Sequence, residues 1–406
     1  MAIKFSSDHL SVYLFNGELS LSHLAKLQIT NFRNLLDVGL SLHNGMTVFH
    51  GDNGEGKTSL LEAIYYLSVG RSFKAENERE VVNQTVALTG GQCVIHGQAI
   101  KLEKEYQIVL LAQSYPKQRT DSSENSYLIK KQIRVNKVAK TASDLFGTIS
   151  VVVFHVDDIR IIEGSPSVRR KFLDILISQS DREYLTSLRR YQKVLQQRNK
   201  LLKSIREKRA NKSELVYWDN MLIEDSYVIS QMRETALIEL SQLVENHFNQ
   251  LGSENRKIDI NLKSTTVTNK SKEEFVKWME SELLNKFPIE LKAGTSLVGP
   301  HRDDFKILVN GFDIGRLGSR GEKKILALAL KMSEASFISD RRDDNPIILL
   351  DDVLSELDEN KRRCVLNMAS IYGQSLITTT DLNLISSVSG INPRYAKVAQ
   401  GKVYTQ

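Results

Sequence analysis

The fold of this 406-residue chain is decided by residues 51–58, which read Gly-Asp-Asn-Gly-Glu-Gly-Lys-Thr. They fill every fixed position of the pattern Gly-x-x-x-x-Gly-Lys-Ser/Thr. A strand-like run precedes them, and a helix-like apolar pattern follows at Leu60, Leu61, Ile64 and Leu67. A glycine-rich turn between a strand and a helix lets backbone N–H groups close around phosphate oxygens. The stretch therefore predicts an α/β core that binds a nucleotide.

The residues of this turn have separate expected roles. Lys57 should reach the β- and γ-phosphates and is also taken as a catalytic residue, and the hydroxyl of Thr58 should ligate Mg²⁺. ATP and Mg²⁺ are therefore the predicted cofactors. The nucleotide contacts predicted from this stretch are Gly51, Asp52, Asn53, Gly54, Glu55, Gly56, Lys57, Thr58 and Ser59.

Two adjacent carboxylates, Asp351 and Asp352, close the apolar run 346–350. Such a run is typical of a strand that is covered on both faces of a parallel sheet. Asp351 is placed to hold Mg²⁺, and Asp352 is placed to orient or deprotonate an attacking water. Because Asp is shorter than the Glu often found in this role, we expect slow hydrolysis. A solvated turn is the alternative, which the preceding apolar run disfavours.

The rest of the chain predicts an α/β head interrupted by helices. Apolar runs at 149–154 and 375–379 predict further parallel strands, and Asn44-Gly45 between alternating runs predicts a hairpin turn. Heptad-like spacing, with Arg198 at one seam position, predicts an antiparallel helical hairpin. The expected parts are an N-terminal extension (1–24), a head (25–180 and 291–406) and a helical lobe (181–290).

Positive charge is concentrated in one segment. The chain has a net charge of +6, whereas residues 169–212 contain 14 Lys and Arg against 4 Asp and Glu. This excess favours an anionic partner such as duplex DNA, with a solvated helix face as the alternative. If this segment is only a solvated face, the DNA site is expected on the head domains or on the loop around Arg119. The predicted DNA contacts are Arg189, Arg190, Lys193 and Lys200.

Several other classes of site are disfavoured by the composition. The two cysteines, Cys93 and Cys364, lack the spacing of a disulfide framework or a zinc site. No run approaches the roughly 18 apolar residues of a membrane span, and no signal peptide is evident at the N-terminus. We therefore expect a protein of the cytoplasm without a membrane partner.

Two further stretches carry a family resemblance. Residues 317–323, Leu-Gly-Ser-Arg-Gly-Glu-Lys, precede a helical run and could bind an anion through a Ser hydroxyl and backbone N–H groups. Together with residues 355–358, they resemble the signature motif and D-loop of ABC ATPase heads. That resemblance implies contacts to the nucleotide of a partner subunit from Ser319, Arg320, Gly321 and Asp358.

The whole motif set is most similar to that of the RecF family. It comprises residues 31–34 (Asn-Phe-Arg-Asn), 154–174, 299–304 (Gly-Pro-His-Arg-Asp-Asp) and 350–358. The resemblance implies an ABC-ATPase-like head, with a mixed sheet and a parallel P-loop core, and an inserted helical lobe. It also implies nucleotide contacts from Arg33 and Asn34, weak DNA-stimulated ATPase activity and an ATP-dependent homodimer. The implied partners are duplex DNA near single-strand gaps and a RecR-type mediator that helps to place RecA.

The chain departs from this family at a few positions. Glu322 stands where the family usually has Gln, Val156 stands where it often has Pro, and no switch His follows Asp381. These departures bear on turnover more than on nucleotide binding. His301 and Arg302 could either contact a ligand or pack the lobes together. The alternative functions are a transport or nuclease-associated ABC module and a structural DNA-binding protein with an inactive nucleotide site.

Overall fold

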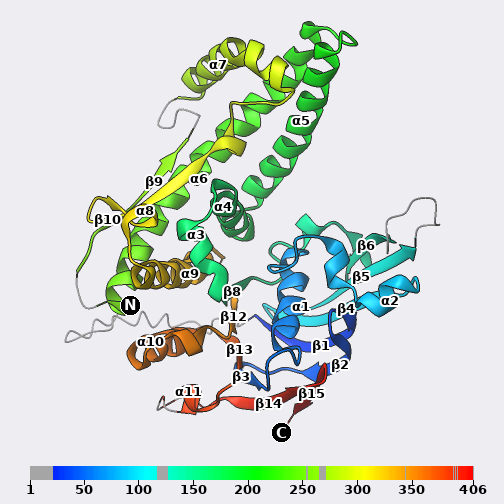
Figure 1. Cartoon of the computed structure of the whole chain (residues 1–406), viewed down its shortest axis with the longest axis vertical. Helices are drawn as coiled ribbons and strands as arrows, with labels where there is room; N and C mark the ends of the chain where they lie inside the picture. The colour runs from blue at the N-terminus through cyan, green and yellow to red at the C-terminus, as the bar shows by residue number, and fades with distance from the viewer. Residues whose placement is uncertain are drawn as a thin grey trace.

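The lower body of the molecule contains two six-stranded sheets, and a long helical arm rises from it (Figure 1). This computed structural model describes residues 22–116, 127–252, 255–264, 271–342, 344–386, 388, 390 and 392–405. The segments 1–21 and 117–126, including Arg119, thus lie outside the described residues. Within the described residues, no helix has the length and apolarity needed to cross a membrane.

The first sheet is antiparallel and has the order β2-β1-β4-β5-β6-β7. Its buried and exposed side chains alternate, as expected of a sheet with one face on the core. Helix α1 (Lys57–Val69) packs in that core, and every residue of α1 except Thr58 is buried. The strands are β1 (His23–Phe32), β2 (Leu35–Ser41), β4 (Gln92–Lys101), β5 (Lys104–Pro116), β6 (Tyr127–Val135) and β7 (Val138–Lys140).

The second sheet is the parallel core, in the order β15-β14-β3-β13-β12-β8. Only β15 pairs antiparallel among its described strands. The predicted strands at 149–154, 346–350 and 375–379 are confirmed, and the parallel pairing brings their carboxyl ends to one edge. The strands are β3 (Gly45–His50), β8 (Val151–His155), β12 (Ile347–Asp351), β13 (Gln374–Thr379), β14 (Arg394–Ala399) and β15 (Lys402–Thr405).

The hairpin predicted at Asn44-Gly45 is wrong. β2 instead pairs with β1 across the turn at Arg33 and Asn34, and β3 pairs in parallel with β13 and β14 in the other sheet. Gly45, at φ 90°, therefore redirects the chain from one sheet to the other. Residues 46–49 are all buried, which the interior of the parallel sheet allows and a half-exposed hairpin strand would not.

The arm is the antiparallel helical hairpin that the spacing predicts. It consists of α5 (Arg182–Arg206) and α6 (Leu215–Leu251), with α7 (Lys272–Ala293) packed at its far end (Figure 1). A three-stranded sheet of β9 (Ile258–Lys263), β10 (Asp304–Val309) and β11 (Phe312–Asp313) lies along α6. The other helices are α2 (Gln84–Leu88), α3 (Ile159–Glu163), α4 (Pro166–Ser180), α8 (Ile314–Leu317), α9 (Arg320–Arg342), α10 (Glu359–Ile371) and α11 (Asn383–Ser386).

Two buried arginines hold the arm together. Arg198, at the seam position, lies 2.6 Å from Asp219 and 2.7 Å from Glu290. Arg233 on α6 reaches Asp174 of α4 at 2.7 Å and Asp303 at 2.9 Å. Since a buried charge is stable only with compensating partners, Arg198 joins α5 to α6 and α7 within the arm, and Arg233 joins α6 to α4 at its base.

The Gly-Pro-His-Arg-Asp-Asp stretch takes part in the same packing. His301 Nδ1 lies 2.5 Å from the Tyr191 hydroxyl, and its Nε2 lies 3.0 Å from the Ser296 carbonyl. Arg302 donates to that carbonyl at 2.8 Å. Burial lowers the pKa of His301 to about 4, so this imidazole is neutral at pH 7. Of the two roles left open by the sequence, the contacts favour lobe packing.

Candidate nucleotide-binding site and nucleic-acid surface

The turn 51–56 needs glycine for its backbone shape. Gly54 and Gly56 have φ values of 85° and 111°, which side chains with a Cβ rarely adopt. A Cβ on Gly56 would also lie 2.7 Å from the Leu35 side chain. The glycines thus allow the turn to run closely over the N-terminus of α1, where backbone N–H groups are available for an anion.

Lys57 is the first residue of α1, and its side chain reaches back to the turn. Its Nζ donates to the backbone carbonyls of Gly51 at 2.7 Å and Asp52 at 2.8 Å. Burial lowers the pKa of Lys57, and the nearby charges of Asp352 and Asp351 partly oppose that shift. Within the described part of the chain it forms no direct ion pair, so its charge remains available to a phosphate.

The two predicted Mg²⁺ ligands, Thr58 and Asp351, are in contact. Asp351 ends β12, and its Oδ1 accepts hydrogen bonds of 2.9 Å from the hydroxyls of both Thr58 and Thr378. His155, at the end of the neighbouring β8, places Nε2 3.4 Å from Asp351 Oδ2. A carboxylate and a hydroxyl supply the hard oxygen ligands that Mg²⁺ prefers, so this donor set fits the ion.

Asp352 has an unusual backbone and an unpaired side-chain oxygen. Its φ of 52° is left-handed, and its amide donates to the Thr378 hydroxyl at 3.1 Å. Its Oδ1 is buried without a hydrogen-bond partner among the described residues. Burial raises the pKa of Asp352, and the charge of Lys57 partly offsets this. A strained backbone and an orphaned carboxylate oxygen are features that accumulate at functional sites.

Arg33 and Asn34, in the turn between β1 and β2, form another wall of the site. The Arg33 guanidinium pairs with the fully buried Glu62 of α1, with Nε 2.5 Å from Oε2. Asn34 donates to the Gly54 carbonyl at 2.8 Å and accepts from the Ser59 hydroxyl at 2.7 Å. The first hairpin is therefore joined directly to the glycine-rich turn.

These groups surround one pocket of about 370 Å³. The sequence reasoning missed three of its lining residues: Glu62, Lys74 and Thr378. Thr378 could have been found from its place at the end of a parallel strand, whereas no pattern marks Glu62 or Lys74. The predicted Gly51, Asp52 and Glu55 belong to the turn but do not line the pocket. The predicted residues that do line it are Arg33, Asn34, Asn53, Gly54, Gly56, Lys57, Thr58, Ser59, Asp351 and Asp352.

The predicted signature lies at the start of α9. Glu322 N–H donates to the Ser319 hydroxyl at 3.2 Å, and Ser319 N–H donates to the Glu322 carboxylate at 2.9 Å, which forms a capping box. These bonds, together with Arg256 at 2.7 Å, lower the pKa of Glu322 to about 2. The unusual carboxylate thus closes the helix end. The four residues predicted to contact a partner's nucleotide are exposed, and they do not line the 370 Å³ pocket of their own chain. They are Ser319, Arg320, Gly321 and Asp358.

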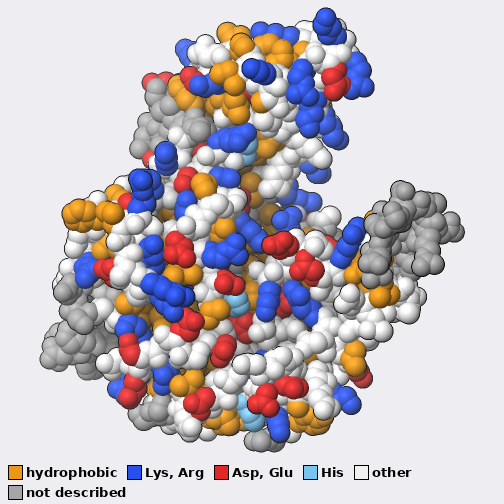
Figure 2. Space-filling view, viewed as in Figure 1, with side chains coloured by type: hydrophobic (Ala, Val, Ile, Leu, Met, Phe, Trp, Pro, Cys, Tyr) orange, Lys and Arg blue, Asp and Glu red, His pale blue; other side chains and the backbone are white. Residues whose placement is uncertain are grey.

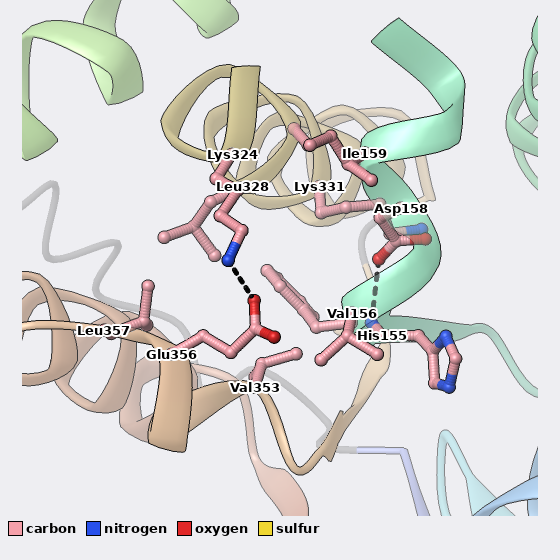
Figure 3. A pocket seen from close by; sticks show the side chains of 12 residues that line it. His155, Val156, Asp158, Ile159, Lys324, Leu328, Lys331, Val353, Glu356 and Leu357 are labelled. Carbon is pink, nitrogen blue, oxygen red and sulfur yellow. Dashed lines mark hydrogen bonds and ion pairs between the residues drawn. The ribbon is translucent and has the colours of Figure 1, made fainter. Parts of the chain in front are cut away.

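A small apolar pocket connects α9 with the helical turn η6 (Val353–Glu356), which follows the two aspartates (Figure 3). Val156 and Leu328 line it, and the Lys324–Glu356 ion pair spans it at 2.8 Å. At about 50 Å³ it is too small for a nucleotide. Val156, at a position where the RecF family often has Pro, therefore belongs to the packing between the signature helix and the D-loop.

The four predicted DNA contacts differ in their surroundings. Lys193 and Lys200 are exposed and form no ion pair within the described ranges. Arg189 lies 3.6 Å from Asp144. Arg190 binds the fully buried Asp225 through two nitrogens, with contacts of 2.6–2.9 Å. Because these four side chains lie mostly off the Leu188–Leu195–Leu202 seam, the sequence predicts that they can be replaced without cost to the helix packing. The contact with Asp225 argues against this for Arg190, because the buried carboxylate would lose its partner.

Comparisons with known proteins identify the family. The sequence matches the model of the RecF/RecN/SMC N-terminal domain over residues 23–392. The DNA replication and repair protein RecF of Herpetosiphon aurantiacus is 34% identical over 366 residues, covering 89% of this chain and 94% of that protein. The chain belongs to the RecF family. The RecF protein of Thermoanaerobacter pseudethanolicus is 36% identical over 359 residues, covering 88% and 94%.

Solved structures agree with this membership. A structure described as the recombination mediator protein RecF-ATP in the RecFOR pathway is 30% identical, with a TM-score of 0.83, and covers 97% of this chain and 100% of that one. The Smc head domain from Pyrococcus furiosus has a TM-score of 0.51 at 15% identity over 95% and 96%, which shows the fold alone. The predicted RecF resemblance and ABC-ATPase-like head are both confirmed.

Proposed function

We propose that this RecF-family protein is a weak, DNA-stimulated ATPase that dimerises on binding ATP and binds duplex DNA near single-strand gaps. It would help a RecR-type partner to place RecA there. The observation that carries the proposal is the gathering of Lys57, Thr58, Asp351 and Asp352 around one pocket while the signature is exposed elsewhere on the same chain. The description of a relative as a mediator in the RecFOR pathway supports the choice of partner.

The pocket residues divide the chemistry among them. The backbone N–H groups of the turn and the Lys57 ammonium bind the phosphates, while Thr58 and Asp351 would hold Mg²⁺. When bound, Mg²⁺ would neutralise part of the charge on the β- and γ-phosphates. Asp352 then orients the attacking water and accepts its proton, a role that its raised pKa suits.

The exposed signature provides the rationale for the dimer. Ser319, Arg320, Gly321 and Asp358 do not line their own pocket, so they act on the nucleotide of a second subunit. Part of the ATP binding energy is then realised only in the dimer, and ATP shifts the monomer–dimer equilibrium. Slow hydrolysis reopens the dimer. The family membership disfavours a transport or nuclease-associated module, and the intact set of pocket residues disfavours an inactive nucleotide site.

DNA binding is assigned to the cations that the protein itself does not neutralise. Figure 2 shows Lys and Arg side chains gathered on the upper arm and again where the arm meets the body. Lys193 and Lys200 are two such cations, and Arg189 is a third that is only loosely paired. Contacts of this kind neutralise phosphates and release counterions without reading sequence. A cytoplasmic location fits this function and stays a prediction.

Complementation between two variants tests the shared site. Ser319→Arg should keep ATP affinity in the monomer but block ATP-dependent dimerisation, because the large side chain cannot fit against a partner's γ-phosphate. Mixed with Lys57→Met subunits, it should form at most one intact composite site per dimer. Sedimentation with and without ATP measures this, alongside duplex binding at several salt concentrations. Loss of ATP from the Ser319→Arg monomer would contradict a site that acts in trans.

A further inference from the structure

A second pocket, of about 350 Å³, lies between the end of α1, α4 and α5, beneath the arm. We call it the cationic pocket. Its carboxylate, Asp174, is already occupied by Arg233 at 2.7 Å and by the Tyr184 hydroxyl at 2.5 Å. Arg71 and Lys171 have no ion-pair partner within the described part of the chain. The pocket's cations besides Arg233 are Arg71, Arg170, Lys171 and Arg189.

The cationic pocket has the character of a phosphate site. Arg170 donates a hydrogen bond of 2.6 Å to the backbone carbonyl of Asp303, and this contact does not neutralise its charge. Arg71 and Lys171 both line this pocket, and burial together with the charge of Arg71 lowers the pKa of Lys171. Because like charges in a partly buried pocket are unfavourable without a counter-ion, an anionic ligand would relieve the repulsion.

A third pocket, of about 390 Å³, connects the cationic pocket to the nucleotide site. It shares Tyr65 and Lys171 with the cationic pocket and shares Lys74 with the nucleotide pocket. Lys74 lies in the chain that follows α1, and Arg71, three residues before it, lines the cationic pocket. Arg71 and Lys74 are therefore exposed at opposite ends of one short segment, each toward a different ligand site.

This short segment, residues 71–74, is held from both sides. Ser72 is buried, and its hydroxyl donates to Glu62, the carboxylate that also binds Arg33 in the nucleotide pocket. The Phe73 ring packs edge-on against Tyr65 at 5.5 Å and lies 5.6 Å from His155, which faces Asp351. The Ser72 hydroxyl also accepts from the amide of Lys74 at 2.8 Å. Movement at one end of the segment should therefore displace the other.

We propose that the 71–74 segment binds phosphate at both of its ends, Lys74 on the ATP triphosphate and Arg71 on a backbone phosphate of duplex DNA in the cationic pocket. This inference rests on the proposed function, because it assumes that duplex DNA is the polyanion. It places part of the DNA in the cationic pocket, which the count of charged residues in segment 169–212 does not predict. It also links the two ligand sites physically, through the hydrogen bond from Ser72 to Glu62 and the contact of the Phe73 ring with His155.

The link has a quantitative consequence. If one segment is ordered by both ligands, ATP raises the affinity for DNA by the same factor by which DNA raises the affinity for ATP. Couplings of this kind are typically about 5- to 150-fold. A variant that keeps both cations but loosens the segment should reduce this factor while preserving both binding sites.

The experiment measures duplex affinity with and without a non-hydrolysable ATP analogue, and nucleotide affinity with and without duplex, with dimerisation followed by sedimentation. Arg71→Gln should weaken duplex binding and flatten its log–log salt slope by roughly 0.9 for a lost phosphate contact, with ATP affinity in the absence of DNA unchanged. Arg71→Lys, which retains the charge, should restore the slope. Lys74→Gln should weaken ATP binding about tenfold and leave duplex affinity without nucleotide unchanged.

Ser72→Ala is the decisive variant. It removes the hydroxyl that donates to Glu62 and keeps both cations, Arg71 and Lys74. Its coupling factor should fall toward 1 while each separate affinity stays within about twofold of the wild type. Lys26→Gln, an exposed lysine of β1, is the matched loss of one charge and should behave as the wild type. A wild-type salt slope in Arg71→Gln, or wild-type coupling in Ser72→Ala, would overturn the proposal. Absence of duplex binding in the wild type would instead overturn the proposed function.

Discussion

The nucleotide pocket and the basic segment 169–212 are both rich in charge, but they use it differently. In the pocket, Lys57 donates to backbone carbonyls, and Asp352 keeps a buried oxygen without a partner among the described atoms. In the basic segment, Arg190 and Arg198 are bound by carboxylates of other elements. One region thus leaves charge available to a ligand, whereas much of the other neutralises it internally.

This difference shows what a local charge count can miss. Four of the acids that neutralise the basic segment lie outside it: Asp219, Asp225, Glu290 and Asp304. The excess of positive charge that segment 169–212 offers to a ligand is therefore smaller in the folded protein than the sequence suggests. If the comparison is right, changes in the pocket affect function and spare stability, and changes at the paired arginines do the reverse.

The largest effect should come from Asp352→Asn. Removing the candidate base should slow ATP hydrolysis about 10²- to 10⁴-fold, as measured by phosphate release. Stability to urea should hold or rise, because burial raises the pKa of Asp352 and thus disfavours its ionised form in the folded protein. The ATP-bound dimer should accumulate. Asp381→Asn, at an exposed carboxylate after β13, is the control, and wild-type turnover in Asp352→Asn would leave that residue a structural role only.

Arg233→Met should show the opposite behaviour, with a large loss of stability. The substitution leaves Asp174 and Asp303 without their buried partner, so the free energy of unfolding should fall by about 3–5 kcal/mol in urea denaturation. Arg209→Met, at an arginine whose side chain is 73% exposed, should change it by less than about 0.5 kcal/mol. Arg209 forms an exposed ion pair with Glu207, so equal effects at the two positions would remove the distinction between buried and exposed ion pairs.

Lys57→Met should reduce ATP affinity by about ten- to a hundredfold, since a charge-assisted bond to phosphate is worth about 1.5–3 kcal/mol. Methionine is of similar length and does not carry the charge that burial disfavours, so stability should not fall. Calorimetry measures the affinity, and sedimentation should show that ATP-dependent dimerisation is lost. Dimerisation at the wild-type level would contradict the role of this lysine in the ATP switch.

The smallest effects should separate Lys193 and Lys200 from Arg190. Replacing both lysines with Gln should lower the salt slope of duplex binding by roughly 0.9 for each lost contact and leave stability within about 0.5 kcal/mol. Arg190→Gln should instead destabilise the arm, because Asp225 is fully buried. An unchanged slope in the lysine variant would show that this face of the arm is only solvated and would favour the cationic pocket as the DNA site.

Much of the nucleotide site could be predicted because its parts are local. The turn before α1 is continuous in sequence, and Asp351 follows an apolar run that marks a buried parallel strand. No sequence pattern marks Lys74 or Glu62 as pocket residues, because their roles depend on how the irregular segment 71–74 packs against α1. The Asn44-Gly45 turn was misread because a short apolar strand looks the same in a hairpin and in a parallel sheet until its neighbours are known.

The sequence by itself determined the phosphate-binding turn, the two aspartates, the parallel strands and the helical hairpin, because each follows from spacing within about 20 residues. Only the tertiary structure decided which charges remain for ligands. Arg190 meets Asp225 across the arm, and Arg71 and Lys74 open into different pockets at the two ends of one segment. Long-range packing chooses these partners, and the energy of a charge depends on its burial and its neighbours rather than on its position in the chain.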